Sequence, residues 1–172
     1  RFPTLEQIHH AISGNARLTL FAQALFQDEP YVTIGMSDIT INRSQGWHTD
    51  LLRGPYARYL DEESCWGEDS EGLYKFLVYL QDGSSLQVAR GAHLRKTPLN
   101  GDDILSSLTD HSIESVPVAA GDVVVMDIRL PHRGSSEEQT ASMELGPSAK
   151  ILVSTVVGRM SNRLTHQMST GN

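Results

Sequence analysis

Five short segments rich in apolar and β-branched residues follow Pro30 and alternate with stretches rich in glycine, proline or acidic residues. They are Tyr31–Ile41, Leu73–Gln81, Leu86–Ala89, Val123–Ile128 and Lys150–Val157. Runs of this length, ended by turn residues such as Gly91 or introduced by the pair Gly121-Asp122, are typical of β-strands. Several short strands in succession predict a closed β architecture, either a barrel or a sandwich.

The first thirty residues have a helical pattern instead. Thr4 and Gln7 have the spacing of a capping box, and Asn15 has the position of an N-cap for a second helix that ends before Pro30. Apolar residues recur at helical spacing after each cap: Leu5, Ile8 and Ile12, then Leu18, Phe21 and Leu25. We therefore expect a mainly β core, residues 31–158, with helices of residues 1–30 packed on its outside and a tail of residues 159–172.

Length and composition restrict the class of protein. The 172 residues fit a single domain, 1–172, and the net charge of -7 argues against nucleic acid or an anionic membrane as the main partner. The single cysteine, Cys65, excludes an internal disulfide, and no apolar run approaches the length of a membrane helix. We expect a cytoplasmic protein whose partner is a small molecule. Because the chain opens at Arg1 without Met, we also expect it to be part of a longer protein.

Three residues form a candidate metal site. His48 and Asp50 stand two positions apart, so on an extended segment both side chains point to one face and can reach one ion. His132 directly follows the Val123–Ile128 segment. Two imidazoles and one carboxylate on an octahedral ion leave three positions open, which is the arrangement of non-haem Fe(II) oxygenases.

A His-x-Asp sequence alone is common by chance, and the alternative is a surface histidine beside a loop aspartate. The separation of 84 positions from His48 to His132 spans several predicted strands, and each ligand lies at a strand edge. Both observations favour a shared site.

Three motifs together resemble the phytanoyl-CoA dioxygenase family. They are His48-Thr49-Asp50, then Ser85-Leu86-Gln87-Val88-Ala89-Arg90-Gly91-Ala92-His93, then Gly121-Asp122-Val123-Val124-Val125 leading to His132. The middle motif of the family usually reads Gly-x-Leu-x-x-x-Pro-Gly-Ser-His, so Ser85, Arg90 and Ala92 depart from it. The resemblance runs from about Ile34 to Gly158.

The resemblance implies a double-stranded β-helix, a jelly-roll or cupin-like barrel, and a dioxygenase that uses Fe(II), 2-oxoglutarate and O2. His48, Asp50 and His132 would hold the iron. Hydroxylation of a small molecule, with release of succinate and CO2, is the expected reaction. The alternative is a β-barrel binding module in which the same residues hold zinc or no metal.

The resemblance also implies a basic residue that binds the far carboxylate of 2-oxoglutarate, on the strand after the distal histidine. Lys150 takes that place, where the family usually has arginine, and Lys75 is its rival. Ser154 shares a strand face with Lys150 and could add a hydroxyl. Lys75 and Tyr79 share a face of their own strand, which could point into the cavity or cover the outside of the sheet.

Other candidates have weaker roles. The resemblance implies a structural role for His93, whereas we expect His9, His10, His111 and His166 to be solvated, and Arg129 and Arg133 as well. The segment Leu51–Gly72 could be a lid over the site or a solvated loop. It carries Arg53, Tyr56, Arg58, Tyr59 and Trp66, and also Cys65, to which we assign no role.

Overall fold

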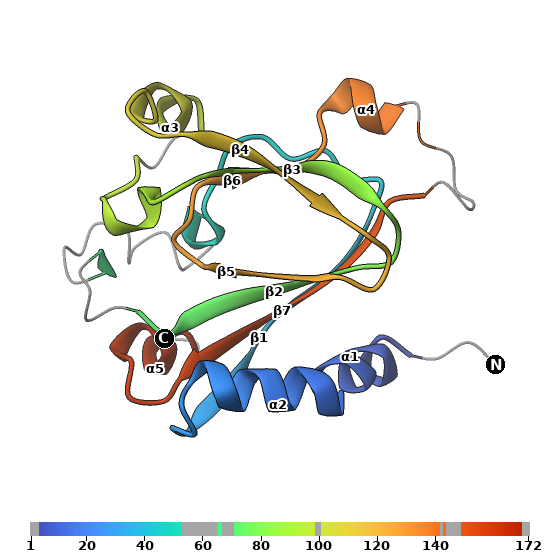
Figure 1. Ribbon diagram of the computed structural model, residues 1–172, viewed down its shortest axis with the longest axis vertical. Helices are drawn as coiled ribbons and strands as arrows, with labels where there is room; N and C mark the ends of the chain where they lie inside the picture. Colours follow the sequence, from blue (N-terminus) through green and yellow to red (C-terminus); the bar gives the residue numbers. More distant parts are fainter. Residues whose placement is uncertain are drawn as a thin grey trace.

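The structure is a computed structural model of the chain, and it describes residues 4–52, 65–66, 71–98, 101–141, 143 and 149–169. Two antiparallel sheets form the centre of the molecule (Figure 1). The larger sheet has the order β1-β7-β2-β5, with bounds Tyr31–Ile41, Ile151–Arg159, Leu73–Tyr79 and Val123–Asp127. The smaller has the order β4-β3-β6, with bounds Ile113–Val118, Gly83–Ala89 and His132–Arg133. The prediction of a mainly β core is confirmed.

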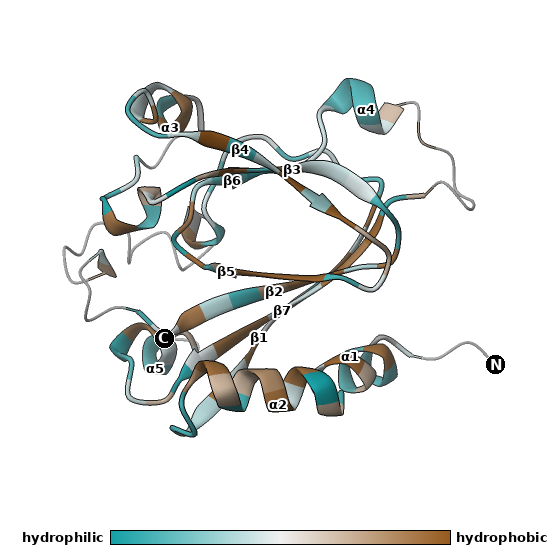
Figure 2. Cartoon of the chain, viewed as in Figure 1, coloured by the Kyte–Doolittle hydropathy of each residue, from teal (hydrophilic) through white to brown (hydrophobic). Residues whose placement is uncertain are grey.

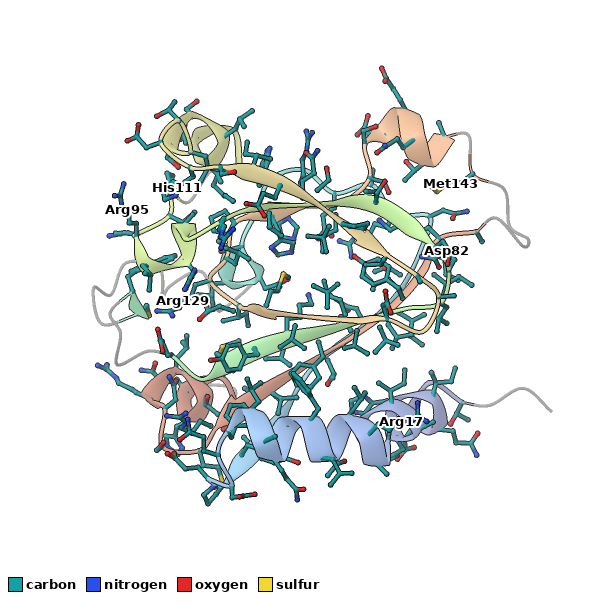
Figure 3. All side chains as sticks on the ribbon, viewed as in Figure 1. Arg17, Asp82, Arg95, His111, Arg129 and Met143 are labelled. Atoms are coloured by element: carbon teal, nitrogen blue, oxygen red, sulfur yellow. The ribbon has the colours of Figure 1, made fainter. Side chains whose placement is uncertain are left out.

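The two sheets face each other across a layer of apolar side chains (Figure 3). Strand alternation places one face of each strand in this layer. Its buried members come from both sheets: Leu77, Tyr79, Leu86, Val118 and Met126. A second buried cluster lies at one end of the larger sheet, among residues that include Ile34, Leu51, Trp66 and Leu73. The inner face of the larger sheet is therefore closed by packing, except where polar residues interrupt it.

Two helices cover the outer face of the larger sheet (Figure 1). These are α1, Leu5–Ser13, and α2, Ala16–Leu25, and the reciprocal bonds of the Thr4–Gln7 capping box are both present. Ala22 of α2 and Phe26, which follows it, pack on Phe76 and Val157 from the sheet. The helices predicted for the first thirty residues are confirmed, because the caps and the apolar periodicity agree with the packing.

Several elements were not expected from the sequence. They are β4, the helices α3, Gly101–Ser107, α4, Glu137–Ala141, and α5, Arg163–Ser169, and two short 3-10 turns, Asp50–Leu52 and Ala92–Leu94. Strand β4 is a mostly exposed edge strand that contains Pro117, which disguises it in the sequence. The hydrophilic helix α4 in Figure 2 has no buried residue. In contrast, α5 buries Leu164 and Met168 within the stretch expected to be a tail.

Among the described residues, no helix has both the length and the apolar composition needed to cross a bilayer.

Candidate metal centre

Backbone pairing brings the first and last of the predicted ligands together. The His48 N–H donates to the carbonyl of His132 at 3.0 Å, and the His132 N–H donates back to the carbonyl of His48 at 2.9 Å. This bridge extends the smaller sheet by one short segment beyond β6. Two residues directly opposite in an antiparallel pair project their side chains to the same face. Asp50 follows at the start of the 3-10 turn Asp50–Leu52.

The three side chains converge on one point. One potential ligand atom from each of His48, Asp50 and His132 lies within 4.8 Å of the other two. The two imidazole rings are 4.2 Å apart between centroids and tilted by 52°. All three residues are at least nine-tenths buried, with exposed fractions of 8%, 1% and 4%. In the described part of the chain, these three residues are the only group of three or more potential metal-binding side chains whose ligand atoms lie this close together.

Backbone carbonyls fix the orientation of both imidazoles. The Nδ1 of His48 lies 2.8 Å from the carbonyl oxygen of Gly46, and the Nδ1 of His132 lies 2.8 Å from that of Leu130. A carbonyl only accepts, so each Nδ1 must carry the proton. In the neutral ring, Nε2 then holds the lone pair and points toward the shared centre. This is the arrangement in which a protein prepares a histidine to ligate a metal.

The two oxygens of Asp50 have different surroundings. Oδ1 accepts a hydrogen bond of 2.7 Å from the ammonium of Lys75, and this ion pair is buried. Oδ2 is buried with no hydrogen-bond partner in the described part of the structure, and it lies 3.9 Å from Nε2 of His132. Burial alone would raise the pKa of Asp50, but the charges of His132, when it is protonated, and of Lys75 outweigh burial and hold that pKa below its ordinary value. The carboxylate is therefore ionised and ready to bind a cation.

This donor set fits a divalent transition metal. Imidazole nitrogen and carboxylate oxygen are both ligands for Fe(II), and three such groups on one side of an ion leave its other side open. The orphaned Oδ2 of Asp50 is satisfied when a cation lies between it and the two imidazoles.

A narrow cavity of about 40 Å³ adjoins His132 between the sheets. The four other predicted site residues all line it: Lys75, Tyr79, Lys150 and Ser154. Lys75 and Tyr79 thus point into the molecule, which decides between the two orientations considered from the sequence. Burial raises the pKa of Tyr79 to about 12, so its hydroxyl keeps its proton. Ser154 and Leu152 line the cavity together, as the alternation along β7 requires.

Lys150 reaches from the larger sheet to the smaller one. Its ammonium donates to the hydroxyl of Ser85 at 3.0 Å and to that of Ser135 at 2.9 Å. Burial lowers the pKa of Lys150, because these partners are neutral and do not balance its charge. Neither serine was recognised from the sequence, although Ser85 stands at a departure from the middle motif. Arg43, which also lines the cavity, was missed as well because no motif marks it.

The other sequence candidates lie away from the three ligands. The expectation that Arg129 is solvated is wrong: its side chain is completely buried and binds both carboxylate oxygens of Asp127 at 2.8 Å (Figure 3). Arg133 is exposed and donates to Gln87. His93 belongs to the 3-10 turn Ala92–Leu94 and is outside the ligand cluster. Of the remaining histidines, His10 and His166 are exposed, whereas His9 and His111 are partly buried.

Only part of the segment considered as a lid is described. Leu51, Cys65 and Trp66 are buried in the same apolar cluster. Arg53, Tyr56, Arg58 and Tyr59 lie outside the described residues. These three described residues of the segment therefore belong to the core.

Comparison with known proteins identifies the fold. No protein-family model matches the sequence. No curated protein matches it either. Solved structures do match: EctD from S. alaskensis with bound Fe has a TM-score of 0.61 and 21% identity over 91% of this chain and 54% of its own. The non-heme alpha ketoglutarate dependent epimerase SnoN from nogalamycin biosynthesis has a TM-score of 0.60 and 15% identity over 87% and 55%.

AviO1 from Streptomyces viridochromogenes Tue57 is similar to the same degree, with a TM-score of 0.57 and 19% identity over 86% of this chain and 59% of its own. The chain thus spans between half and three-fifths of the length of these structures. Its fold is the double-stranded β-helix, as predicted.

Proposed function

We propose that this chain is the core of an Fe(II)- and 2-oxoglutarate-dependent dioxygenase that hydroxylates a small molecule, and that it is related to the phytanoyl-CoA dioxygenase family. The observation that carries the proposal is the convergence of His48, Asp50 and His132 within 4.8 Å, with each Nδ1 bound to a backbone carbonyl. Two imidazoles and one carboxylate on one side of an ion are the ligand set of this enzyme class.

The proposed reaction is compatible with that ligand set. Bound iron supplies the activation of O2 that couples oxidation of the substrate to decarboxylation of 2-oxoglutarate. In balance, 2-oxoglutarate, O2 and a C–H bond of the substrate give succinate, CO2 and a C–OH bond. One oxygen atom enters succinate and the other enters the product. The three residues would hold the ion among side chains that are at least nine-tenths buried, which limits the access of water to the reaction.

Lys150 is the residue that binds the far carboxylate of 2-oxoglutarate. Its ammonium lines the cavity beside His132, is partly buried, and is bound to two neutral hydroxyls. A carboxylate entering the cavity supplies the counter-charge that these hydroxyls do not. Lys75 is a poorer candidate for binding the far carboxylate of 2-oxoglutarate, because its ammonium is already paired with the carboxylate of Asp50. Lysine in place of the usual arginine is the departure from the family pattern, and the Lys150 side chain still lines the cavity.

Two hydroxyls complete the co-substrate pocket. Ser154 and Tyr79 both line the cavity with Lys150, and both belong to the larger sheet. A protonated tyrosine and a serine can each donate to a carboxylate oxygen. We assign them the recognition of 2-oxoglutarate together with Lys150.

The structural neighbours support the proposed class of enzyme, though not the roles of single residues. One neighbour structure is EctD with 2-oxoglutarate and 5-hydroxyectoine, and another is a non-heme monooxygenase, ThoJ, as a nickel complex. SnoN, by contrast, is an epimerase on the same fold. Hydroxylation is thus our choice among the reactions that one scaffold supports.

Anaerobic titration tests the proposal. Addition of Fe(II) and then 2-oxoglutarate to the chain should produce a visible metal-to-ligand charge-transfer band, because 2-oxoglutarate chelates iron through its keto and carboxylate oxygens. The variant His132→Ala is the control and should bind neither. Iron binding without the band would contradict the role of 2-oxoglutarate. No iron binding, or tight zinc binding in its place, would favour the non-catalytic binding module.

A further inference from the structure

We propose that Lys75 is a positioning residue that restricts Asp50 to binding the metal through a single oxygen. This inference rests on the proposed function, because it takes the metal site as given. The starting observation is the contact of 2.7 Å between Nζ of Lys75 and Oδ1 of Asp50. Both side chains are buried, with exposed fractions of 10% for Lys75 and 2% for Asp50.

The two oxygens of Asp50 divide between two partners. Oδ1 faces the ammonium, whereas Oδ2 faces the imidazoles and lies 3.9 Å from Nε2 of His132. Oδ2 has no hydrogen-bond partner among the described residues, so it is the oxygen left for a cation. A carboxylate can chelate a metal through both oxygens or bind through one. The contact with Lys75 selects the second mode.

Lys75 cannot easily give up this contact. Its backbone lies in the middle of β2, opposite Val156 of β7 on one side and Met126 of β5 on the other. The side chain leaves the sheet toward the interior, where Asp50 is its carboxylate partner. Separating a buried pair leaves two charges unbalanced in a region of low dielectric, which is strongly unfavourable.

The number of oxygens that Asp50 supplies decides how many positions remain on the ion. With one oxygen, the protein fills three positions of an octahedron and leaves three. With two oxygens it fills four and leaves two. Chelation by 2-oxoglutarate takes two positions and O2 takes one, so the full set requires three. Lys75 thus acts on the metal through Asp50, whose Oδ1 its ammonium contacts.

Manganese provides a direct count. Mn(II) prefers six ligands and is paramagnetic, so the relaxation of water protons per bound ion rises with the number of waters that it carries. With Mn(II) alone, and no 2-oxoglutarate, we expect about three bound waters on the wild-type chain. In Lys75→Met the carboxylate is released to chelate, so relaxivity per bound ion should fall by about one third, from three waters to two.

Arg43→Met is the matched control. It removes another cation from the same cavity, whereas the partners of the Asp50 carboxylate are Lys75 and His132. Its relaxivity with Mn(II) should equal that of the wild type. Circular dichroism of both variants shows whether they fold.

Each outcome decides the question. Two waters on the wild-type chain would contradict the proposal, and so would a folded Lys75→Met variant with unchanged relaxivity, since Lys75 would then serve stability only. If Lys75→Met does not fold, the smaller change Lys75→Gln takes its place, and a wild-type count of two waters contradicts the proposal in either case. Failure of the wild type to bind Mn(II) would instead contradict the proposed function, so the two failures are distinguishable.

Discussion

Two lysines of the larger sheet point into one cavity, and the charge of their partners separates their roles. Lys75 binds the carboxylate of Asp50, whereas Lys150 binds the hydroxyls of Ser85 and Ser135. A lysine already paired with a carboxylate gains little from a second one. A partly buried lysine held only by hydroxyls gains a full ion pair. The same residue type thus serves the metal in one place and the co-substrate in the other.

Replacement of Lys150 by methionine should weaken the binding of 2-oxoglutarate while leaving Fe(II) binding unchanged. A hydrogen bond to a charged group contributes about 1.5–3 kcal/mol, which corresponds to a loss of roughly 10- to 150-fold in affinity. Anaerobic titration of the charge-transfer band measures both constants in one experiment. Lys96→Met, at an exposed position, is the control. Equal loss of iron binding in Lys150→Met would contradict the assignment.

At the scale of residues, the sequence was sufficient to group His48, Asp50 and His132, which converge in the structure, and insufficient for their neighbours. His48 and Asp50 stand two positions apart, and that spacing is the signal, although Asp50 begins a 3-10 turn and does not continue an extended segment. The pairing of Lys75 with Asp50 joins residues 25 positions apart, on a strand and a turn, and no local pattern encodes it. Arginine is usually a surface residue, and only the tertiary structure shows that the carboxylate of Asp127 balances the charge of Arg129.

At the scale of elements, the turn between β5 and β6 contains a buried ion pair close to the distal ligand. The guanidinium of Arg129 binds both oxygens of Asp127 and also donates to the backbone carbonyl of Cys65 at 3.1 Å. It therefore ties this turn to the segment around Cys65. Three residues later the chain reaches His132.

Arg129→Met should destabilise the fold by about 3–5 kcal/mol, because it leaves the Asp127 carboxylate without its buried partner. Urea unfolding followed by circular dichroism measures the loss. Arg133→Met is the matched control: Arg133 is exposed, and its replacement should change stability by no more than about 0.5 kcal/mol. A similar effect in both variants would show that the ion pair does not stabilise this turn.

The contact between β7 and α5 depends on a residue without a side chain. A Cβ at Gly158 would lie 2.7 Å from Cδ1 of Leu73 and would overlap with Oγ1 of Thr165. Helix α5 can therefore approach the strand only at a glycine. Helix α5 is one of the elements that the sequence pattern missed, since a helix of seven residues shows too little periodicity to be recognised.

Gly158→Ala should destabilise the fold by about 1–3 kcal/mol through overpacking. Gly83→Ala is the control, because a Cβ at Gly83 would meet nothing within 4 Å. Thermal unfolding of the two variants gives the comparison. A Gly158→Ala protein as stable as Gly83→Ala would mean that α5 moves away from the strand at little cost.

At the scale of the whole molecule, the candidate site links the two sheets. His48 and His132 extend from the smaller sheet, whereas Lys75, Lys150 and Ser154 belong to the larger sheet or its edge. Asp50 joins Lys75 across this space, and Lys150 joins Ser85 of β3. Most of the strands were predictable because their apolar runs are buried. Which side chains meet across the space depends on sheet packing and could not be predicted.

Because the ligands belong to a site between the sheets, a bound metal should stabilise the entire fold. Any ligand that binds only the folded state adds about 2.7 kcal/mol at a concentration 100 times its Kd, or roughly 5–10 °C in Tm for a chain of this size. Scanning calorimetry with Mn(II) should show this rise, and His132→Ala should abolish it.

Imidazoles bind metal only when neutral, so the rise in Tm should shrink as the buffer becomes more acidic. Asp50 does not cause this loss of metal binding. Its pKa lies below the ordinary value of an aspartate, so the carboxylate stays ionised at the pH where imidazoles take up protons. An equal rise in His132→Ala would place the ion elsewhere on the chain, and the link between the metal and both sheets would be lost.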